Sequence, residues 1–171
     1  VFVEESGKGP SDGARIFVGE NGDIEILTGG ASLGQGFETT MAQICANALG
    51  VDYQRITVIH GQTNLIPYGI GAHAARATVM TGSAVNVTAL TLRTKALDLA
   101  AEMLQLPADS LDIVDGTVIV TDNPSGPSIT LAEIARRNEE GLVAEDFHKT
   151  KESAFPYGIH FAVVKVDPET G

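Results

Sequence analysis

Cysteine, tryptophan and positive charge are scarce in this chain, and each scarcity excludes a class of protein. Among 171 residues Cys45 is the only cysteine, which excludes a disulfide framework and any cysteine-rich metal or iron-sulfur site. Tryptophan is absent, and 11 Lys and Arg stand against 22 Asp and Glu, for a net charge of -11. A surface this acidic repels nucleic acid and anionic membranes, so neither is expected as a partner.

Membrane-spanning and secretory patterns are also missing. No apolar run approaches the roughly 20 residues of a membrane span. The opening residues, Val1 to Glu5, lack the basic start and long apolar stretch of a signal peptide. We therefore expect a cytoplasmic protein with Cys45 as a small buried residue. The four histidines, His60, His73, His148 and His160, lack the spacing of a metal-ligand set.

Hydrophobic periodicity predicts an α+β fold. With 43% hydrophobic residues the chain has enough apolar side chains for a substantial core. Asn21-Gly22 predicts a hairpin turn, Gly50 a helix end, and Thr130 with Glu133 a capping box. The expected elements, in order, are strands at 14–18 and 23–27, a helix at 38–49, a strand at 55–60, a helix from about 85 to 103, strands at 111–114 and 117–120, a helix at about 131–139, and strands at 142–149 and 157–166.

Two stretches have the same layout at an offset of 55 residues. Residues 46–61 and 101–116 each run helix, loop, strand, and Leu49, Ile56 and Val58 have apolar counterparts 55 positions on. Chance similarity and duplication are both open as explanations. The expected architecture is helices packed on mixed, largely antiparallel β-sheets, with two similar helix–strand units. The long connection from Gly61 to Thr78 is of the kind that is usually functional or disordered.

The most informative segment is the glycine-rich corner between the second strand and the first helix, Gly29 to Thr39. Glycines permit positive φ and let a ligand approach backbone N–H groups at a helix start, which predicts a cradle for an anionic or polar ligand. A phosphate-binding P-loop is excluded because Gln35 stands where the lysine is required, and Thr39 breaks a dinucleotide fingerprint. The alternative is a tight turn with a capping glutamine.

A second candidate contact is the small-residue segment that leads into the long helix, Pro67 to Thr78. Its backbone is free to lie against a flat or bulky ligand. Arg76 is a candidate for reaching a phosphate with its planar guanidinium, and Thr78 and Thr81 offer hydroxyl donors. The alternative is a flexible surface loop whose Arg76 is solvated.

Several ordered blocks together resemble a known family. The runs 33–44, 49–51, 67–82 and 157–161, followed by 166–171, are similar to the large subunit of the molybdenum hydroxylases: xanthine dehydrogenase, aldehyde oxidase and aerobic carbon monoxide dehydrogenase. The resemblance implies that residues 1–171 are part of a molybdopterin-binding domain, with possible subdomains 1–120 and 121–171. The cofactor-binding residues that it implies are Gly34, Gln35, Gly36, His73, Ala74, Ala75, Arg76, Ala77 and Thr78.

The resemblance also implies roles for these blocks. Gln35 is expected near the molybdenum without ligating it. Residues 73–78 are expected around the pterin and its tail, which is either a phosphate or a cytosine dinucleotide. The whole enzyme would hydroxylate aldehydes or N-heterocycles, or oxidise carbon monoxide. Electrons would pass to iron-sulfur clusters and FAD on partner subunits or domains. The expected partners are these, the remainder of the large subunit and a small-molecule substrate.

The resemblance places no catalytic residue in this segment. The family's general-base glutamate, in a Gly-Glu-Pro-Pro-like context, is expected beyond Gly171, and Cys45 does not match the cysteine of the carbon monoxide enzymes. We therefore expect a piece of a longer chain, truncated at both ends, that is inactive alone and retains little or no cofactor. The competing interpretation is a non-catalytic anion-binding or subunit-assembly module. An NAD-binding oxidoreductase is disfavoured by the failed fingerprint.

Overall fold

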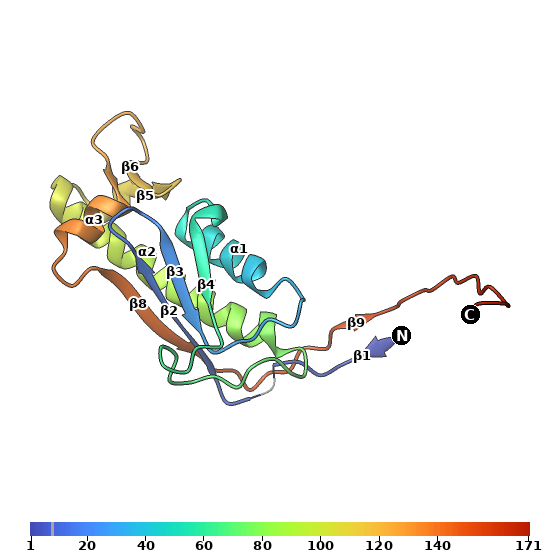
Figure 1. Cartoon of the computed structure of the whole chain (residues 1–171). Helices are drawn as coiled ribbons and strands as arrows, with labels where there is room; N and C mark the ends of the chain where they lie inside the picture. The colour runs from blue at the N-terminus through green and yellow to red at the C-terminus, as the bar shows by residue number, and fades with distance from the viewer. Residues whose placement is uncertain (8) are drawn as a thin grey trace.

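The computed structural model describes residues 1–7 and 9–171, and it contains one mixed four-stranded sheet covered by helices, two smaller sheets and a projecting arm (Figure 1). The four-stranded sheet has the order β4-β3-β2-β8. Its strands are β2 (Asp12–Val18), β3 (Ile24–Thr28), β4 (Ile56–Ile59) and β8 (Leu142–His148). β2 is antiparallel to both its neighbours, whereas β3 and β4 are parallel. The predicted α+β class is confirmed.

The hydrophobic core lies between this sheet and two helices, α1 (Phe37–Leu49) and α2 (Gly82–Leu104). Alternate residues of β2 and β3 are buried, as expected for strands with one face on the core. The apolar residues that repeat along the long helix lie in this core: Val85, Ala89, Leu92 and Ala96 are fully buried. Cys45 on α1 is buried too, and this burial raises the pKa of its thiol to about 12.

The two similar helix–strand units predicted from the sequence recur element by element. The first is α1, a 3₁₀ turn (Tyr53–Arg55) and β4; the second is α2, a 3₁₀ turn (Ala108–Ser110) and β5 (Leu111–Val114). Both helix ends, both 3₁₀ turns and both strands are 55 residues apart. Each helix ends on a left-handed residue, Gly50 and Gln105. Their partners differ, because β4 pairs with β3 in parallel and β5 pairs antiparallel with β6.

The small sheet beyond the end of α2 contains the second predicted hairpin. β5 pairs with β6 (Thr117–Val120), and β6 pairs with β7 (Ile129–Thr130). Helix α3 (Leu131–Arg137) begins with the predicted capping box of Thr130 and Glu133. It ends two residues before the expected Glu139, because Asn138 is extended and its side-chain amide donates to the carbonyl of Gly141.

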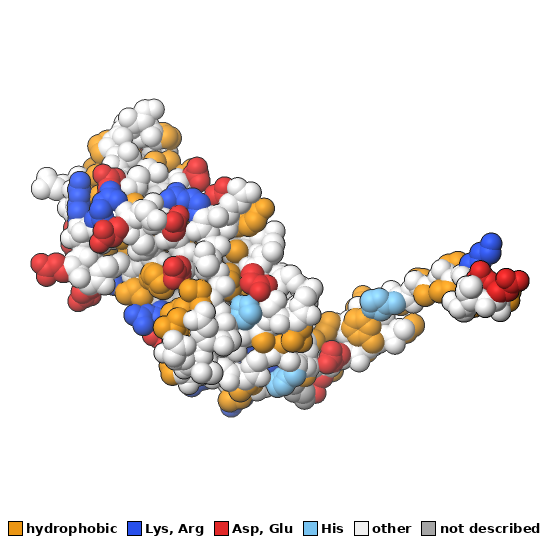
Figure 2. Space-filling view, in the orientation of Figure 1, with side chains coloured by type: hydrophobic (Ala, Val, Ile, Leu, Met, Phe, Trp, Pro, Cys, Tyr) orange, Lys and Arg blue, Asp and Glu red, His pale blue; other side chains and the backbone are white. Residues whose placement is uncertain are grey.

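The last predicted strand, 157–166, is wrong beyond Gly158. Only β9 (Tyr157–Gly158) forms a ladder, with β1 (Phe2–Val3), and within the described residues 159–166 pair with no strand. β-Branched and aromatic residues favour strands, but a ladder needs a partner edge. This arm projects from the body with its apolar side chains in solvent (Figures 1 and 2): Phe161 is 90% and Val163 100% exposed.

No helix in the described ranges is long and apolar enough to cross a membrane.

Candidate functional site

One end of the four-stranded sheet gathers both segments singled out from the sequence. β3 and β4 are parallel, so the glycine-rich corner after Thr28 and the connection after Ile59 leave the sheet at the same end. β2 is antiparallel to β3, which puts its first residue, Asp12, at this end as well. The carboxyl ends of parallel strands are the usual place for a ligand in α/β sheets.

The first two glycines of the corner are explained by packing. Gly71 N donates to Gly29 O at 3.2 Å, so the connection crosses directly over the end of β3. A Cβ on Gly29 would lie 2.3 Å from the Cα of Gly69, and one on Gly30 would lie 2.3 Å from the ring of Phe37. These two positions are glycine because other parts of the chain occupy the space.

Gly34 and Gly36 have a different reason to be glycine. Their φ values are 91° and 72°, and a Cβ on either would meet nothing within 4 Å. Between them Gln35 is exposed, and its side chain closes the turn: Oε1 accepts from Leu33 N and Nε2 donates to Ala31 O at 3.0 Å. The capping part of the alternative is wrong, because the α1 N-cap, Gly36, makes no side-chain cap hydrogen bond and Gln35 bonds within the turn.

The first turn of α1 already holds a carboxylate. Glu38 accepts from Ser32 Oγ at 3.0 Å and lies 2.9 Å from His60 Nε2. The hydrogen bond with His60, then those with the Glu38 amide and with Ser32, lower the pKa of Glu38 below its ordinary value. A second negative charge at this helix end would be repelled, so the corner suits a polar contact through Gln35 better than an anion on the helix dipole.

The second segment has unusual backbone conformations. Ala74 and Ala75 have φ values of 46° and 47°, a left-handed region that residues with a Cβ rarely adopt. Directly afterwards Ala77–Thr81 forms a π-helical turn before α2 begins. Strained residues and π-helical turns are both concentrated at functional sites and persist only where the surroundings hold them.

Arg76, at the centre of this segment, is fully buried. Its guanidinium donates to Asp12 Oδ2 at 3.0 Å, to Gly71 O at 3.1 Å and to Ser11 O at 3.2 Å. Asp12 also accepts from the Thr81 hydroxyl and, at 3.0 Å, from the amide of Gly13. The alternative of a solvated Arg76 on a surface loop is therefore wrong, and the side chain points into the protein.

Gln35 and the second segment meet at one cavity. It has a volume of about 550 Å³, and residues from four stretches of the chain form its three walls: Ser6, Gln35, Ala75, Ala77, Thr78, Val79, Ala154, Phe155 and Pro156. The base of the β1–β9 arm forms its third wall, where Ser6 and Ala154 are bridged. Two segments that are 40 residues apart in sequence are thus brought to the same space.

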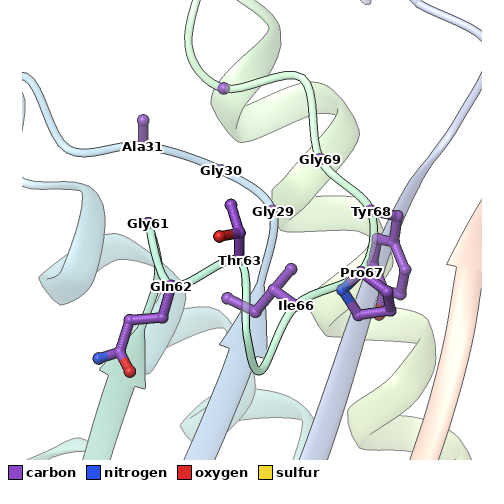
Figure 3. A pocket seen from close by; sticks show the side chains of 11 residues that line it. Gly29, Gly30, Ala31, Gly61, Gln62, Thr63, Ile66, Pro67, Tyr68 and Gly69 are labelled. Atoms are coloured by element: carbon purple, nitrogen blue, oxygen red, sulfur yellow. The ribbon is translucent and has the colours of Figure 1, made fainter.

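The other half of the glycine corner lines a neighbouring cavity of about 350 Å³ (Figure 3). Gly29, Gly30 and Ala31 form one wall, and the connection after β4 forms the other, with Ile66 and Thr63 between them (Figure 3). Tyr68 lies at its edge and packs against Phe147, with ring centroids 4.6 Å apart and the two rings tilted by 56°. Burial, followed by the nearby Glu145 carboxylate, raises the pKa of Tyr68 to about 12.

The structure divides the residues implied by the family resemblance into three groups. Gln35, Ala75, Ala77 and Thr78 line the 550 Å³ cavity. Gly34, Gly36, His73 and Ala74 are next to the lining residues in sequence, and His73 is exposed. Arg76 does not line the cavity, because it is fully buried and pairs with Asp12. The residues that sequence analysis missed are Ser6, Val79 and Ala154 to Pro156; the apolar Phe155-Pro156 pair ahead of the expected strand was the available signal.

The cavity offers positioning rather than acid–base chemistry. The described residues that line it include no carboxylate, imidazole, amine or thiol. Within the described ranges, no group of three or more His, Cys, Asp or Glu side chains is arranged to hold a metal ion. The available groups are backbone amides and carbonyls, the Gln35 amide and the Thr78 hydroxyl, which suit a bulky ligand with polar edges.

The fold and this cavity define an α+β ligand-binding domain in which two loops meet at one end of a mixed sheet. The family model of the molybdopterin cofactor-binding domain matches residues 1–171. The chain belongs to this family, which confirms the resemblance found in the sequence.

Curated relatives extend over the whole chain. Identity is 34% over 181 residues to the gamma subunit of the 6-hydroxypseudooxynicotine dehydrogenase complex of Paenarthrobacter nicotinovorans, covering 100% of this chain and 22% of that protein. Identity is 32% over 191 residues to the carbon monoxide dehydrogenase large chain of Hydrogenophaga pseudoflava, covering 100% of this chain and 24% of that protein. The chain thus spans less than a quarter of the length of these relatives.

Solved structures of oxidoreductases contain the same fold. A reconstituted carbon monoxide dehydrogenase from Oligotropha carboxidovorans is similar with a TM-score of 0.78 and 31% identity, over 90% of this chain and 21% of that one. Quinoline 2-oxidoreductase from Pseudomonas putida 86 is similar with a TM-score of 0.76 and 27% identity, over 91% and 22%. The neighbours carry the same fold as part of much longer chains.

Proposed function

We propose that this chain holds one side of a molybdopterin cofactor in the cavity between Gln35 and the segment Ala75 to Thr78. The observation that carries the proposal is that both segments line a single cavity of about 550 Å³. Had they lain on opposite faces, no single cofactor would have been able to touch both. Membership of the molybdopterin cofactor-binding family supplies the ligand class.

The residues present fit such a ligand. Gln35 provides an amide donor and a carbonyl acceptor once its bonds within the turn are exchanged for bonds to the cofactor. The small side chains of Ala75 and Ala77 leave the backbone accessible, and Thr78 adds an exposed hydroxyl. Because the guanidinium of Arg76 is buried, a phosphate or cytosine dinucleotide tail would meet backbone amides and the Thr78 hydroxyl rather than this charge. When bound, the cofactor supplies the redox chemistry, while these residues bind and orient it.

The remaining expectations concern the whole protein. We propose that it is an oxidoreductase that hydroxylates aldehydes or N-heterocycles or oxidises carbon monoxide, as the family resemblance implies. The names of the carbon monoxide dehydrogenase large chain and of quinoline 2-oxidoreductase support the carbon monoxide and N-heterocycle alternatives. Iron-sulfur and FAD partners, and a cytoplasmic location, are part of this proposal. We further propose that residues 1–171 act within a larger molybdopterin-binding domain. A division near residue 120 stays a prediction, and β8 joins both parts in one sheet.

We also propose that these 171 residues alone are inactive and hold little cofactor. The described residues lining the cavity provide no general base, and the cavity is walled only by Gln35, the Ala75–Val79 segment and the base of the arm. Near-stoichiometric molybdenum in the isolated chain, or hydroxylation by it, would contradict this proposal.

The test uses the whole protein that contains this chain. Molybdenum is measured by elemental analysis, and the pterin by fluorescence after oxidative release. We expect both in the wild type and a reduced content in Gln35→Ala, since one side-chain contact is lost. Gln105→Ala, at the far end of α2, is the matched control and should keep both. Wild-type protein without molybdenum and pterin would overturn the proposal.

An assembly role is the second candidate, and the projecting arm favours it. Phe2, Val3, Tyr157 and Ile159 expose between 43% and 82% of their surface. Apolar surface of this kind marks protein interaction sites. Normal subunit assembly by a protein that never carries molybdopterin would favour this candidate over cofactor binding.

A further inference from the structure

We infer that the buried pair Asp12–Arg76 is a positioning device that holds the Ala74–Thr78 segment in its cofactor-binding shape, and that Arg76 does not itself grip the cofactor's phosphate. This inference rests on the proposed function and assigns it two further residues. Asp12 belongs to β2 and was not indicated by any sequence motif.

The Asp12–Arg76 ion pair is buried away from solvent. The side chains of Arg76 and Asp12 are 0% and 1% exposed, and their closest atoms, Nη1 and Oδ2, are 3.0 Å apart. An ion pair taken out of water is retained at a large desolvation cost that only good geometry and additional hydrogen bonds offset. Here both charges have such bonds, so the pair is a fixed point of the structure.

The hydrogen bonds reach both sides of the strained segment. Ahead of it, Arg76 donates to the carbonyl of Gly71 at 3.1 Å. Behind it, the Thr81 hydroxyl, in the last residue of the π-helical turn, donates to the same Asp12 oxygen that accepts from Arg76. The eleven residues from 71 to 81 are therefore held at the start, the middle and the end by hydrogen bonds to the Asp12 carboxylate or to the Arg76 guanidinium.

The tied segment needs such support. Ala74 and Ala75 occupy the left-handed region, where the Cβ of an alanine lies too close to the following carbonyl oxygen. A backbone in this state persists only when its surroundings over-determine it. Ala75, Ala77 and Thr78 line the cavity with Gln35, so the anchored backbone is the part that would contact the cofactor.

The test separates positioning from direct phosphate contact. The whole protein is prepared as wild type, Asp12→Asn, Arg76→Gln and the double variant, and molybdenum and released pterin are measured in each. Each single variant leaves one buried group without its counter-charge, so we expect its cofactor content to fall about tenfold or more. The double variant removes both charges and should regain content above either single variant.

Direct contact predicts a different pattern. If Arg76 grips the phosphate, Asp12→Asn keeps wild-type content while Arg76→Gln and the double variant are both low. That result would overturn the inference. A wild type without molybdenum and pterin would instead overturn the proposed function, and the inference with it.

Amide hydrogen exchange distinguishes positioning from general loss of folding. In Asp12→Asn we expect protection to fall about tenfold further in residues 72–81 than at Leu92 in the core of α2, which reports the stability of the whole fold. Equal loss at both places would mean that the pair supports the whole fold, and would overturn the inference. Asp112→Asn is the matched control, because Asp112 forms an ion pair with Arg93 of α2. Neither residue is among the described residues that line the cavity. Asp112→Asn should change neither exchange at 72–81 nor cofactor content.

Discussion

The two segments that face the cavity are held in opposite ways. Gln35 is exposed, and its hydrogen bonds reach residues two and four positions away. Arg76 is fully buried, and its bonds to Asp12 and Ser11 join residues 64 and 65 positions apart. The glycine corner is therefore an adaptable contact that can exchange its own hydrogen bonds for a ligand's, whereas the Ala74–Thr81 segment is preorganised by the rest of the fold.

This difference suits a divided task. A ligand that meets a preorganised backbone loses little binding energy to ordering it, and a flexible side chain on the other wall can adjust to the bound group. The two segments also differ in how well their residue types suit the local backbone conformation. Gly34 and Gly36 face open space, while Ala74 and Ala75 hold a shape that alanine disfavours.

The largest expected effect comes from removing the arginine of the buried pair. Arg76→Ala leaves the Asp12 carboxylate buried without its counter-charge, which costs about 3–5 kcal/mol in the free energy of unfolding. Gln35→Ala, on the exposed wall, should change it by about 0.5 kcal/mol or less. Urea unfolding measures both values. Arg93→Ala is the matched control, because its pair with Asp112 is partly exposed and contributes about 1 kcal/mol or less. Equal losses in the free energy of unfolding for Arg76→Ala and Gln35→Ala would contradict the difference between the buried segment and the exposed corner.

A smaller effect is expected within the glycine corner itself. Gly29→Ala places a Cβ 2.3 Å from the Gly69 backbone, and such overpacking costs about 1–3 kcal/mol. Gly34→Ala has open space and pays only for its positive φ, about 1 kcal/mol. Thermal unfolding of the two variants should rank them in this order. The reverse order would mean that the connection does not cross the end of β3 as described.

The smallest expected effect is the response of the corner to acid. The folded pKa of Glu38 lies below its ordinary value of 4.5, chiefly because of the hydrogen bond with His60. A lowered folded pKa stabilises the folded state above the unfolded value, and this stabilisation is lost as the pH falls below 4.5 through the folded pKa. Amide exchange in residues 31–38 should therefore accelerate over this range, and Glu38→Gln should abolish the change. Because Glu38 is at the surface, the effect is small. Loss of protection at the corner that is identical in the wild type and in Glu38→Gln would contradict the assignment.

Local signals in the sequence were sufficient for most of the fold. Asn21-Gly22 specified a hairpin, Gly50 ended α1, and Thr130 with Glu133 started α3, because each of these residues acts on backbone groups within four positions. The repeat at 55 residues was also visible, since similar apolar spacing produced the same helix, 3₁₀ turn and strand twice.

Long-range contacts were beyond such reasoning. The strand expected to Val166 failed because pairing depends on a partner edge, which the local pattern does not report. The candidate site was predicted in part: Gln35, Ala75, Ala77 and Thr78 line the cavity, but Ser6 and Phe155 arrive there from the arm. The solvated alternative for Arg76 failed for the same reason, because its partner is 64 residues away.

The sequence by itself determined most of the helices and strands, the glycine-rich corner, the small-residue segment before α2 and the family to which the chain belongs. Turn chemistry, apolar spacing and ordered motifs depend on neighbouring residues, so they can be recognised without the fold. Only the tertiary structure decided that the glycine-rich corner and the small-residue segment line one cavity, and that Arg76 forms an ion pair with Asp12. Which distant groups meet depends on strand direction and register, and these are settled when the sheet and helices pack together.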